Sequence, residues 1–75
     1  MKISDVMSLR GLDWLKGYLC VQMHTDSWDW LFGISLDWDW EAFKSSVLER
    51  AHPNIKENLE KFLNDYPNNY QSYLE

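Results

Sequence analysis

The chain has 75 residues, of which 45% are hydrophobic and 16% aromatic, and its formal net charge at pH 7 is −5. This length suits a single domain over residues 1–75, and the composition is too apolar for a disordered chain. One cysteine excludes an internal disulfide, and no apolar run approaches the roughly 20 residues that span a bilayer. We therefore expect a soluble, cytoplasmic protein that does not act at a membrane.

The first residues predict a helix that ends near Gly17. Its apolar side chains recur at spacings of three: Val6, Leu9, Leu12 and Leu15. Ser4 or Asp5 can cap its start, because their side-chain oxygens accept hydrogen bonds from the free N–H groups of a first turn. Glycine is common just after the last helical residue, so Gly17 is expected to end this helix.

Two runs after residue 17 show the period-two alternation of β-strands. In residues 18–23 every second side chain is large and aliphatic. The second run has a large apolar side chain at every even position: Trp28, Trp30, Phe32, Ile34, Leu36, Trp38 and Trp40. Because side chains alternate between the two faces of a strand, these runs predict strands over residues 18–23 and 28–36.

An antiparallel β-hairpin is the expected connection, because the residues between these runs are turn formers. A four-residue loop places Met23 opposite Trp28, whereas a three-residue loop places His24 there. The first register buries more apolar area and is preferred. In this hairpin Phe32 and Ile34 are expected to be core residues, covered by the first and third helices.

A second helix is predicted after the hairpin. Asp39 or Asp37 can cap it, and the positive end of the helix dipole favours Glu41 in its first turn. Its apolar face consists of Trp40, Phe43, Val47 and Ala51. This helix should end at His52, because a residue before proline is disfavoured in the α region.

A third helix is predicted to begin at Pro53, since proline fits the first helical position. Its apolar face consists of Ile55, Leu59, Phe62, Leu63 and Tyr66. After Pro67 a further turn or two is expected, with Tyr70, Tyr73 and Leu74 on one side. The predicted fold is therefore α+β: a small single domain with an N-terminal helix, an antiparallel hairpin and two to three C-terminal helices, in the order αββαα.

The net charge is confined to one third of the sequence. Between Gly17 and Phe43 there is no lysine or arginine but there are five carboxylates, whereas the rest of the chain has seven acidic and seven basic side chains. The same segment holds four of the five tryptophans, and such a combination is typical of a contact surface. The predicted partner-binding residues are Asp26, Asp29, Asp37, Asp39, Glu41, Trp28, Trp30 and Trp38.

The tryptophans could equally serve as core. A two-stranded sheet with few helices cannot easily cover seven large side chains along one strand, so core and interface remain open for Trp28 and Trp38. Trp38 is the better candidate for exposure, because it leaves the apolar face if the chain is helical from residue 38 onward.

No residue pattern predicts an enzyme. His24 and Asp26 lie two residues apart, as an acid–base pair can, but no nucleophile accompanies them at a recognised spacing. Asp37, Asp39 and Glu41 alternate like the oxygen donors of a calcium loop, yet the glycine and the distal glutamate of such a loop are missing. We therefore expect no catalytic residue, no metal and no cofactor.

The lysines and arginines are dispersed and outnumbered, which disfavours direct nucleic-acid binding. An anionic aromatic surface instead suits a larger protein with a basic surface. We predict a small acidic intracellular binding protein, a stoichiometric inhibitor or immunity-type protein of a phage or mobile element, that blocks the basic, nucleic-acid-binding surface of its target and so counters a defence system. The alternative is a self-associating accessory protein that forms a homodimer through the hairpin edge or the tryptophan stripe.

Overall fold

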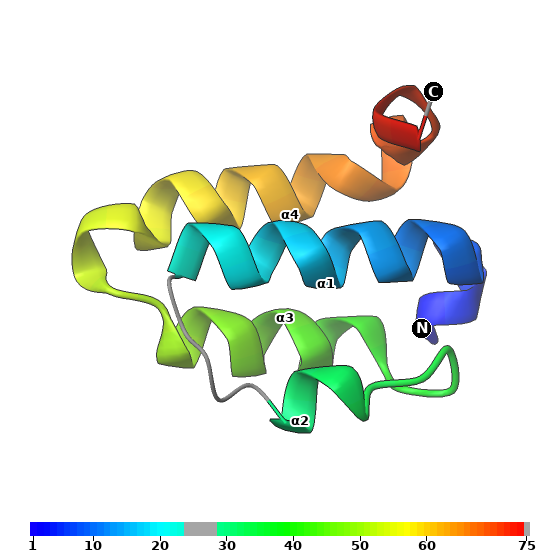
Figure 1. Ribbon diagram of the computed structural model, residues 1–75, viewed down its shortest axis with the longest axis horizontal. Coiled ribbons are helices and arrows are strands. Elements are labelled where there is room, and N and C mark those ends of the chain that lie inside the picture. Colours follow the sequence, from blue (N-terminus) through cyan, green and yellow to red (C-terminus); the bar gives the residue numbers. More distant parts are fainter. Residues whose placement is uncertain (24–28, 75) are drawn as a thin grey trace.

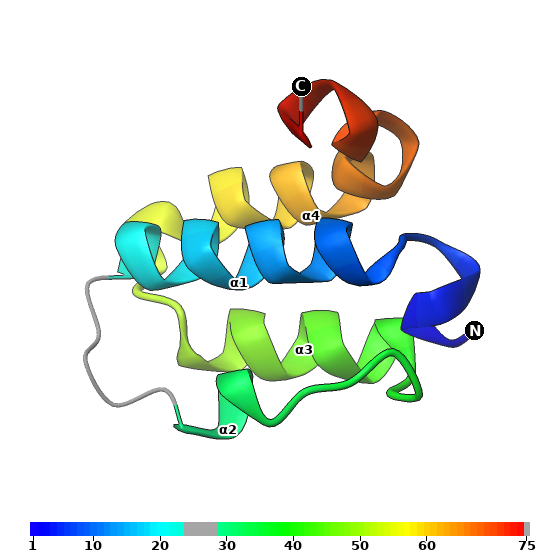
Figure 2. The ribbon, with the colours of Figure 1, turned by 45° about the vertical axis from the view of Figure 1, so that its right-hand side comes forward.

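Helices account for all the regular structure of residues 1–23 and 29–74, the part of the chain that the computed structural model describes. The elements are η1 (Ile3–Asp5, a 3-10 helix), α1 (Leu9–Met23), α2 (Asp29–Phe32), α3 (Trp40–Arg50) and α4 (Pro53–Leu74). Helix α4 packs against both α1 and α3, and α2 lies on the side of the molecule away from α4 (Figure 1, Figure 2). The predicted α+β fold, αββαα, is wrong, because the described residues are all-α and contain no strand.

Helix α1 continues through the segment predicted to be the first strand. The Ser8 hydroxyl accepts a hydrogen bond from the Gly11 N–H at 3.2 Å and so caps the start of this helix. Its buried side chains recur at spacings of three and four: Leu12, Leu15, Leu19 and Met23. Gly17 lies exposed in the middle of α1 and does not end it.

The predicted strand at residues 18–23 is wrong because the alternation there is weak. Apolar side chains occupy even positions, such as Tyr18 and Cys20, as well as the odd ones. Such a short run fits a strand or a helix equally well, and only the packing decides between them. In a helix the backbone groups bond within the segment itself, whereas an isolated two-stranded hairpin is at best marginally stable. The helix also places Leu19 and Met23 in the core together with the earlier leucines.

The second predicted strand is also absent. Residues 29–32 form the single turn of α2, which ends where the Gly33 N–H approaches the carbonyls of Asp29 and Trp30, each at 3.2 Å. Leu31 and Ile34 are buried, whereas Phe32 is 64% exposed. The core prediction is therefore confirmed for Ile34 and wrong for Phe32, because a helical turn buries residues three apart rather than two. Trp28 and the predicted loop at 24–27 lie outside the described residues.

A loop that contains a turn at residues 35–38 follows α2 and runs beside the N-terminal segment. Three backbone hydrogen bonds join the two: Ile3 N–H to the Trp38 carbonyl at 2.8 Å, Ser4 N–H to the Leu36 carbonyl at 3.0 Å, and Trp40 N–H to the Met1 carbonyl at 2.7 Å. An isolated bridge pairs Lys2 with Asp39. This loop thus pairs with the first residues of the chain, whereas the alternation predicted pairing with residues 18–23.

The predictions for the next helix are confirmed. Asp39 caps α3, and its carboxylate accepts a hydrogen bond from the Ala42 N–H at 3.0 Å. Helix α3 ends at Arg50, just before His52 and Pro53. The predicted apolar face is buried at Trp40, Phe43 and Val47 and partly buried at Ala51.

Helix α4 begins at Pro53 as predicted, but it continues through Pro67 to Leu74. The further turns expected after Pro67 are present as part of α4, and they leave the axis of the first part of the helix (Figure 1, Figure 2). Proline inside a helix removes one backbone hydrogen bond and bends the helix without having to end it. Leu59, Leu63 and Tyr66 are buried in α4.

The described residues pack around one hydrophobic core. It combines residues of η1, α1, α3 and α4 with Leu31 and Ile34, and Phe62 is only half-buried against it. The helices of residues 1–23 and 29–74 include none that is long and apolar enough to cross a membrane.

Candidate functional site

In the acidic segment (residues 17–43), α2 and the loop that follows it expose two aromatic rings and two carboxylates that form no ion pair among the described residues. Asp29 and Phe32 lie on α2, and Asp37 and Trp38 lie on the loop. Phe32 is 64% exposed and Trp38 is 40% exposed. No ion pair within residues 1–23 and 29–74 involves Asp29 or Asp37. We call these four residues the acidic surface.

The other two described carboxylates of the segment have partners. The Asp39 carboxylate contacts the ammonium group of Met1 at 2.9 Å and caps α3. The hydrogen bond from this ammonium group, with a second from the Ala42 N–H, holds the pKa of Asp39 below its usual value. Glu41 lies 3.2 Å from the Lys44 ammonium, one helical turn further along. These two acids stabilise the start of α3 and are less available to a partner than Asp29 and Asp37.

In the folded protein, positively charged side chains from outside the acidic segment contact residues within it. The Lys16 ammonium donates a hydrogen bond to the Ile34 carbonyl at 2.7 Å. The Arg50 guanidinium lies 4.6 Å from the ring centre of Trp30, and the Lys44 ammonium lies 5.6 Å from that of Trp40. The charge of the segment is therefore partly compensated by its neighbours, which the sequence did not indicate.

The tryptophans of the segment have different surroundings. Trp40 is 2% exposed and belongs to the core. Trp30 is half-buried, with Arg50 over its ring. Trp38 is exposed, and no aromatic ring or cation of the described residues lies against it. The stripe of tryptophans inferred from the alternation is therefore not a continuous surface.

The predicted partner-binding residues thus fall into three groups. Asp29, Asp37 and Trp38 are exposed and form no ion pair or cation–π contact among the described residues. Asp39 and Glu41 are also exposed but form ion pairs, and the half-buried Trp30 contacts Arg50. Asp26 and Trp28 lie outside the described residues. Phe32 was missed because the alternation placed it in the core, and its position directly before Gly33 at the end of a turn is the one signal that could have found it.

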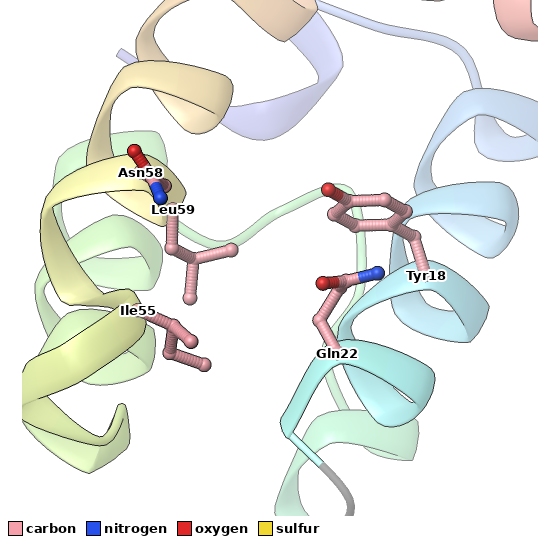
Figure 3. A pocket seen from close by; sticks show the side chains of 5 residues that line it. All are labelled: Tyr18, Gln22, Ile55, Asn58 and Leu59. Carbon is pink, nitrogen blue, oxygen red and sulfur yellow. The ribbon is translucent and has the colours of Figure 1, made fainter.

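A small pocket lies between α1 and α4. Figure 3 shows Tyr18 and Gln22 on α1 facing Ile55 and Leu59 on α4, with Asn58 beside them. Its volume is about 100 Å³, and Tyr18 is the one titratable residue in its lining. Burial raises the pKa of Tyr18, so its hydroxyl remains protonated near neutral pH. The pocket therefore offers apolar contacts and a few hydrogen bonds but no acid–base pair for catalysis.

A second apolar area lies on the outer side of α1. Trp14, Tyr18 and Val21 border it together with Gly17 and Asp13. Val21 is 66% exposed, whereas Trp14 and Tyr18 are half-buried and stack on each other at 5.4 Å. We call this area the outer face of α1.

The described residues contain no group of three histidine, cysteine or acidic side chains that could hold a metal ion. Comparisons of the chain with protein-family models, with curated proteins and with solved structures found no match. What the protein does must therefore be inferred from its own surfaces.

Proposed function

We propose that this protein acts inside the cell as a small acidic binding protein. It inhibits a larger target by covering a basic, nucleic-acid-binding surface on that target. The observation that carries this proposal is the exposure of the four residues of the acidic surface: two large aromatic side chains, and two carboxylates that form no ion pair among the described residues.

Charge supports a basic partner. The net charge of −5 disfavours contact with nucleic acid or with other acidic surfaces, whereas it accelerates association with a basic one. Asp29 and Asp37 are positioned to attract such a surface, since no ion pair of the described residues neutralises them. Nucleic-acid-binding surfaces are strongly basic, because their lysine and arginine side chains must contact phosphates.

The exposed aromatic side chains indicate that the acidic surface contacts its partner in a complex and does not only attract it by charge. Two hydrogen bonds hold the backbone of Trp38. Its carbonyl accepts one from the Ile3 N–H, and its own N–H donates one to the Ser35 carbonyl at 3.2 Å. A partner that covers Trp38 therefore loses little affinity to ordering this loop. Exposed tryptophan in such a position is typical of an anchoring residue at an interface.

Self-association is the second candidate function, and a different surface favours it. The predicted hairpin edge does not exist, and the tryptophans do not form a stripe. The outer face of α1 is the remaining route, because Val21 is exposed there beside Trp14 and Gly17. Two copies that covered this face would form a homodimer and leave the acidic surface free.

The test begins with capture of a target from a host lysate on immobilised protein. The captured protein is then produced alone, and its affinity for nucleic acid is measured by fluorescence anisotropy as our protein is added. We expect nucleic-acid binding to be lost at a one-to-one ratio. The double variant Asp29→Lys/Asp37→Lys should remain folded and fail to inhibit, because it replaces attraction by repulsion.

The matched control is Asp13→Lys/Glu60→Lys, which makes the same change of charge at exposed positions outside the acidic surface. It should inhibit nearly as well as the parent. If the captured protein binds nucleic acid equally well at saturating amounts of our protein, the proposed function is wrong. A dimer in sedimentation that Val21→Glu converts to a monomer would then favour self-association.

A further inference from the structure

Two tryptophans of the acidic segment already hold a cation. Trp30 follows Asp29 in the sequence and has the Arg50 guanidinium 4.6 Å from its ring centre. Trp40 precedes Glu41 and has the Lys44 ammonium 5.6 Å from its ring centre. In both pairs helix α3 supplies the cation, and the attraction is that of a positive charge to the face of an aromatic ring.

Trp38 also has acidic neighbours in the sequence, but its ring is more exposed than those of Trp30 and Trp40. Asp37 and Asp39 flank it in the sequence, and Asp37 has no ion-pair partner in the described part of the chain. The ring is 40% exposed and carries neither a cation nor another ring from the described residues. This exposed, electron-rich ring is next in the sequence to a carboxylate that forms no ion pair among the described residues, so the ring is open to a positive group from outside the molecule.

We propose that Trp38 and Asp37 bind an arginine side chain of the partner protein, with the guanidinium lying on the Trp38 ring and the Asp37 carboxylate as its counter-charge. This inference rests on the proposed function and names the residue of the basic partner that the acidic surface recognises. Arginine is favoured over lysine because its planar guanidinium can stack on an indole ring and still donate to a carboxylate. Arg50, whose guanidinium lies over the Trp30 ring, is an arginine on an indole face within the protein itself.

The test uses hexaarginine and hexalysine peptides as probes of the full chain. The indole N–H signals of the tryptophans are followed by nuclear magnetic resonance at low and at moderate salt, and the Trp38 signal is assigned from Trp38→Phe. We expect the Trp38 signal to shift on addition of hexaarginine, and hexaarginine to bind several-fold more tightly than hexalysine. Trp38→Ala should weaken hexaarginine binding by about two- to fivefold, since an exposed cation–π contact is worth about that factor.

The matched pair of charge variants is Asp37→Asn and Asp29→Asn. Each removes one unpaired carboxylate, but only Asp37 adjoins Trp38, so Asp37→Asn should weaken hexaarginine binding more. Circular dichroism establishes that each variant is folded. If Trp38→Ala does not fold, Trp38→Phe decides the matter, because the smaller ring should bind hexaarginine more weakly than tryptophan does.

The outcomes separate this inference from the proposed function. Equal binding of both peptides to the parent, with no loss in Trp38→Ala, would overturn the arginine site and leave a diffuse acidic surface for a basic partner. Absence of binding by either peptide at low salt would contradict both. Loss of arginine preference in Trp38→Ala, with lysine binding retained, supports the arginine site.

Discussion

Tyr66 contributes a buried hydrogen bond to the contact between α1 and α4. It is 1% exposed, and its hydroxyl donates to the Gly11 carbonyl at 2.6 Å. Its ring also stacks on Trp14 at 5.6 Å. A buried hydroxyl is costly without a partner, so this bond fixes how the two helices meet.

We expect Tyr66→Phe to lower the free energy of unfolding by about 1 kcal/mol, because the ring remains while the hydrogen bond is lost. Urea denaturation measures this change. Tyr73→Phe is the control, since Tyr73 is 42% exposed and its hydroxyl forms no hydrogen bond within the described residues. Equal stability of Tyr66→Phe and the parent would show that the hydroxyl finds an equally good partner in the unfolded chain.

The same residue predicts a dependence of stability on pH. Burial, with the nearby Tyr70 and Tyr73, raises the pKa of Tyr66 from 10.0 to about 12. The folded state therefore holds the proton more tightly than the unfolded state. This contribution to stability is complete below pH 10 and is lost as the pH rises towards the folded pKa.

We expect the difference in unfolding free energy between the parent and Tyr66→Phe to be constant below pH 10.0 and to shrink as the pH approaches 12. Urea denaturation of both proteins at a series of pH values measures this difference, and the other titrating groups cancel because both proteins contain them. A difference that stays unchanged up to pH 12 would mean that the phenol ionises as readily in the folded state as in the unfolded one.

At the scale of elements, the two glycines of α1 have opposite roles. A Cβ atom at Gly11 would lie 2.8 Å from Cδ2 of Tyr70, so glycine is needed there for the close approach of α4. A Cβ atom at Gly17 would have no heavy atom within 4 Å. Gly17 is thus a weak point of the helix without a packing reason, and its cost in α1 helps to explain why the sequence indicated a helix end there.

We expect Gly17→Ala to raise the free energy of unfolding by about 0.5 to 1 kcal/mol, because alanine favours the helix and meets no neighbour. Gly11→Ala should not show this gain, since the Tyr70 ring has to move. Thermal unfolding followed by circular dichroism compares the two variants. Destabilisation by Gly17→Ala would contradict a helix that passes through residue 17.

At the scale of the whole molecule, α4 is the helix that joins the other two long helices. Leu63 is fully buried in α4, which packs against both α1 and α3. A single core of this size leaves only a few kcal/mol of net stability. Loss of one central side chain should therefore affect the entire fold.

We expect Leu63→Ala to cost about 2 to 5 kcal/mol, which is most of the stability of so small a protein. The control Val21→Ala, at a position that is 66% exposed, should change the stability by no more than about 0.5 kcal/mol. Urea denaturation measures both variants. Similar midpoints for the two would show that α4 does not hold the core together.

The whole-molecule distribution of charge differs from the distribution along the sequence. In the sequence the acidic segment contains no cation, whereas in the structure Lys16, Lys44 and Arg50 reach it from α1 and α3. Asp29 and Asp37 remain without an ion pair among the described residues. The acidic surface is therefore smaller than the acidic segment, and it is centred on fewer residues than composition alone indicated.

The sequence by itself determined the parts of the fold that carry local signals. The Asp39 cap, the end of α3 before Pro53 and the buried face of α4 follow from side chains that act on their own or adjacent turns. The exposure of Trp38 was also predictable, because its position did not fit the apolar face of the following helix. Such features depend on a few neighbouring residues, which is why the amino-acid order suffices to find them.

Only the tertiary structure decided the conformation of residues 18–23 and 29–36. Their apolar alternation is compatible with strands, but Leu19 and Leu31 are buried because helices of distant parts of the chain cover them. The conformation of the loop at Trp38 likewise depends on its pairing with the first residues. These choices rest on contacts between residues far apart in the sequence, and local periodicity carries no information about which distant surface is available to be covered.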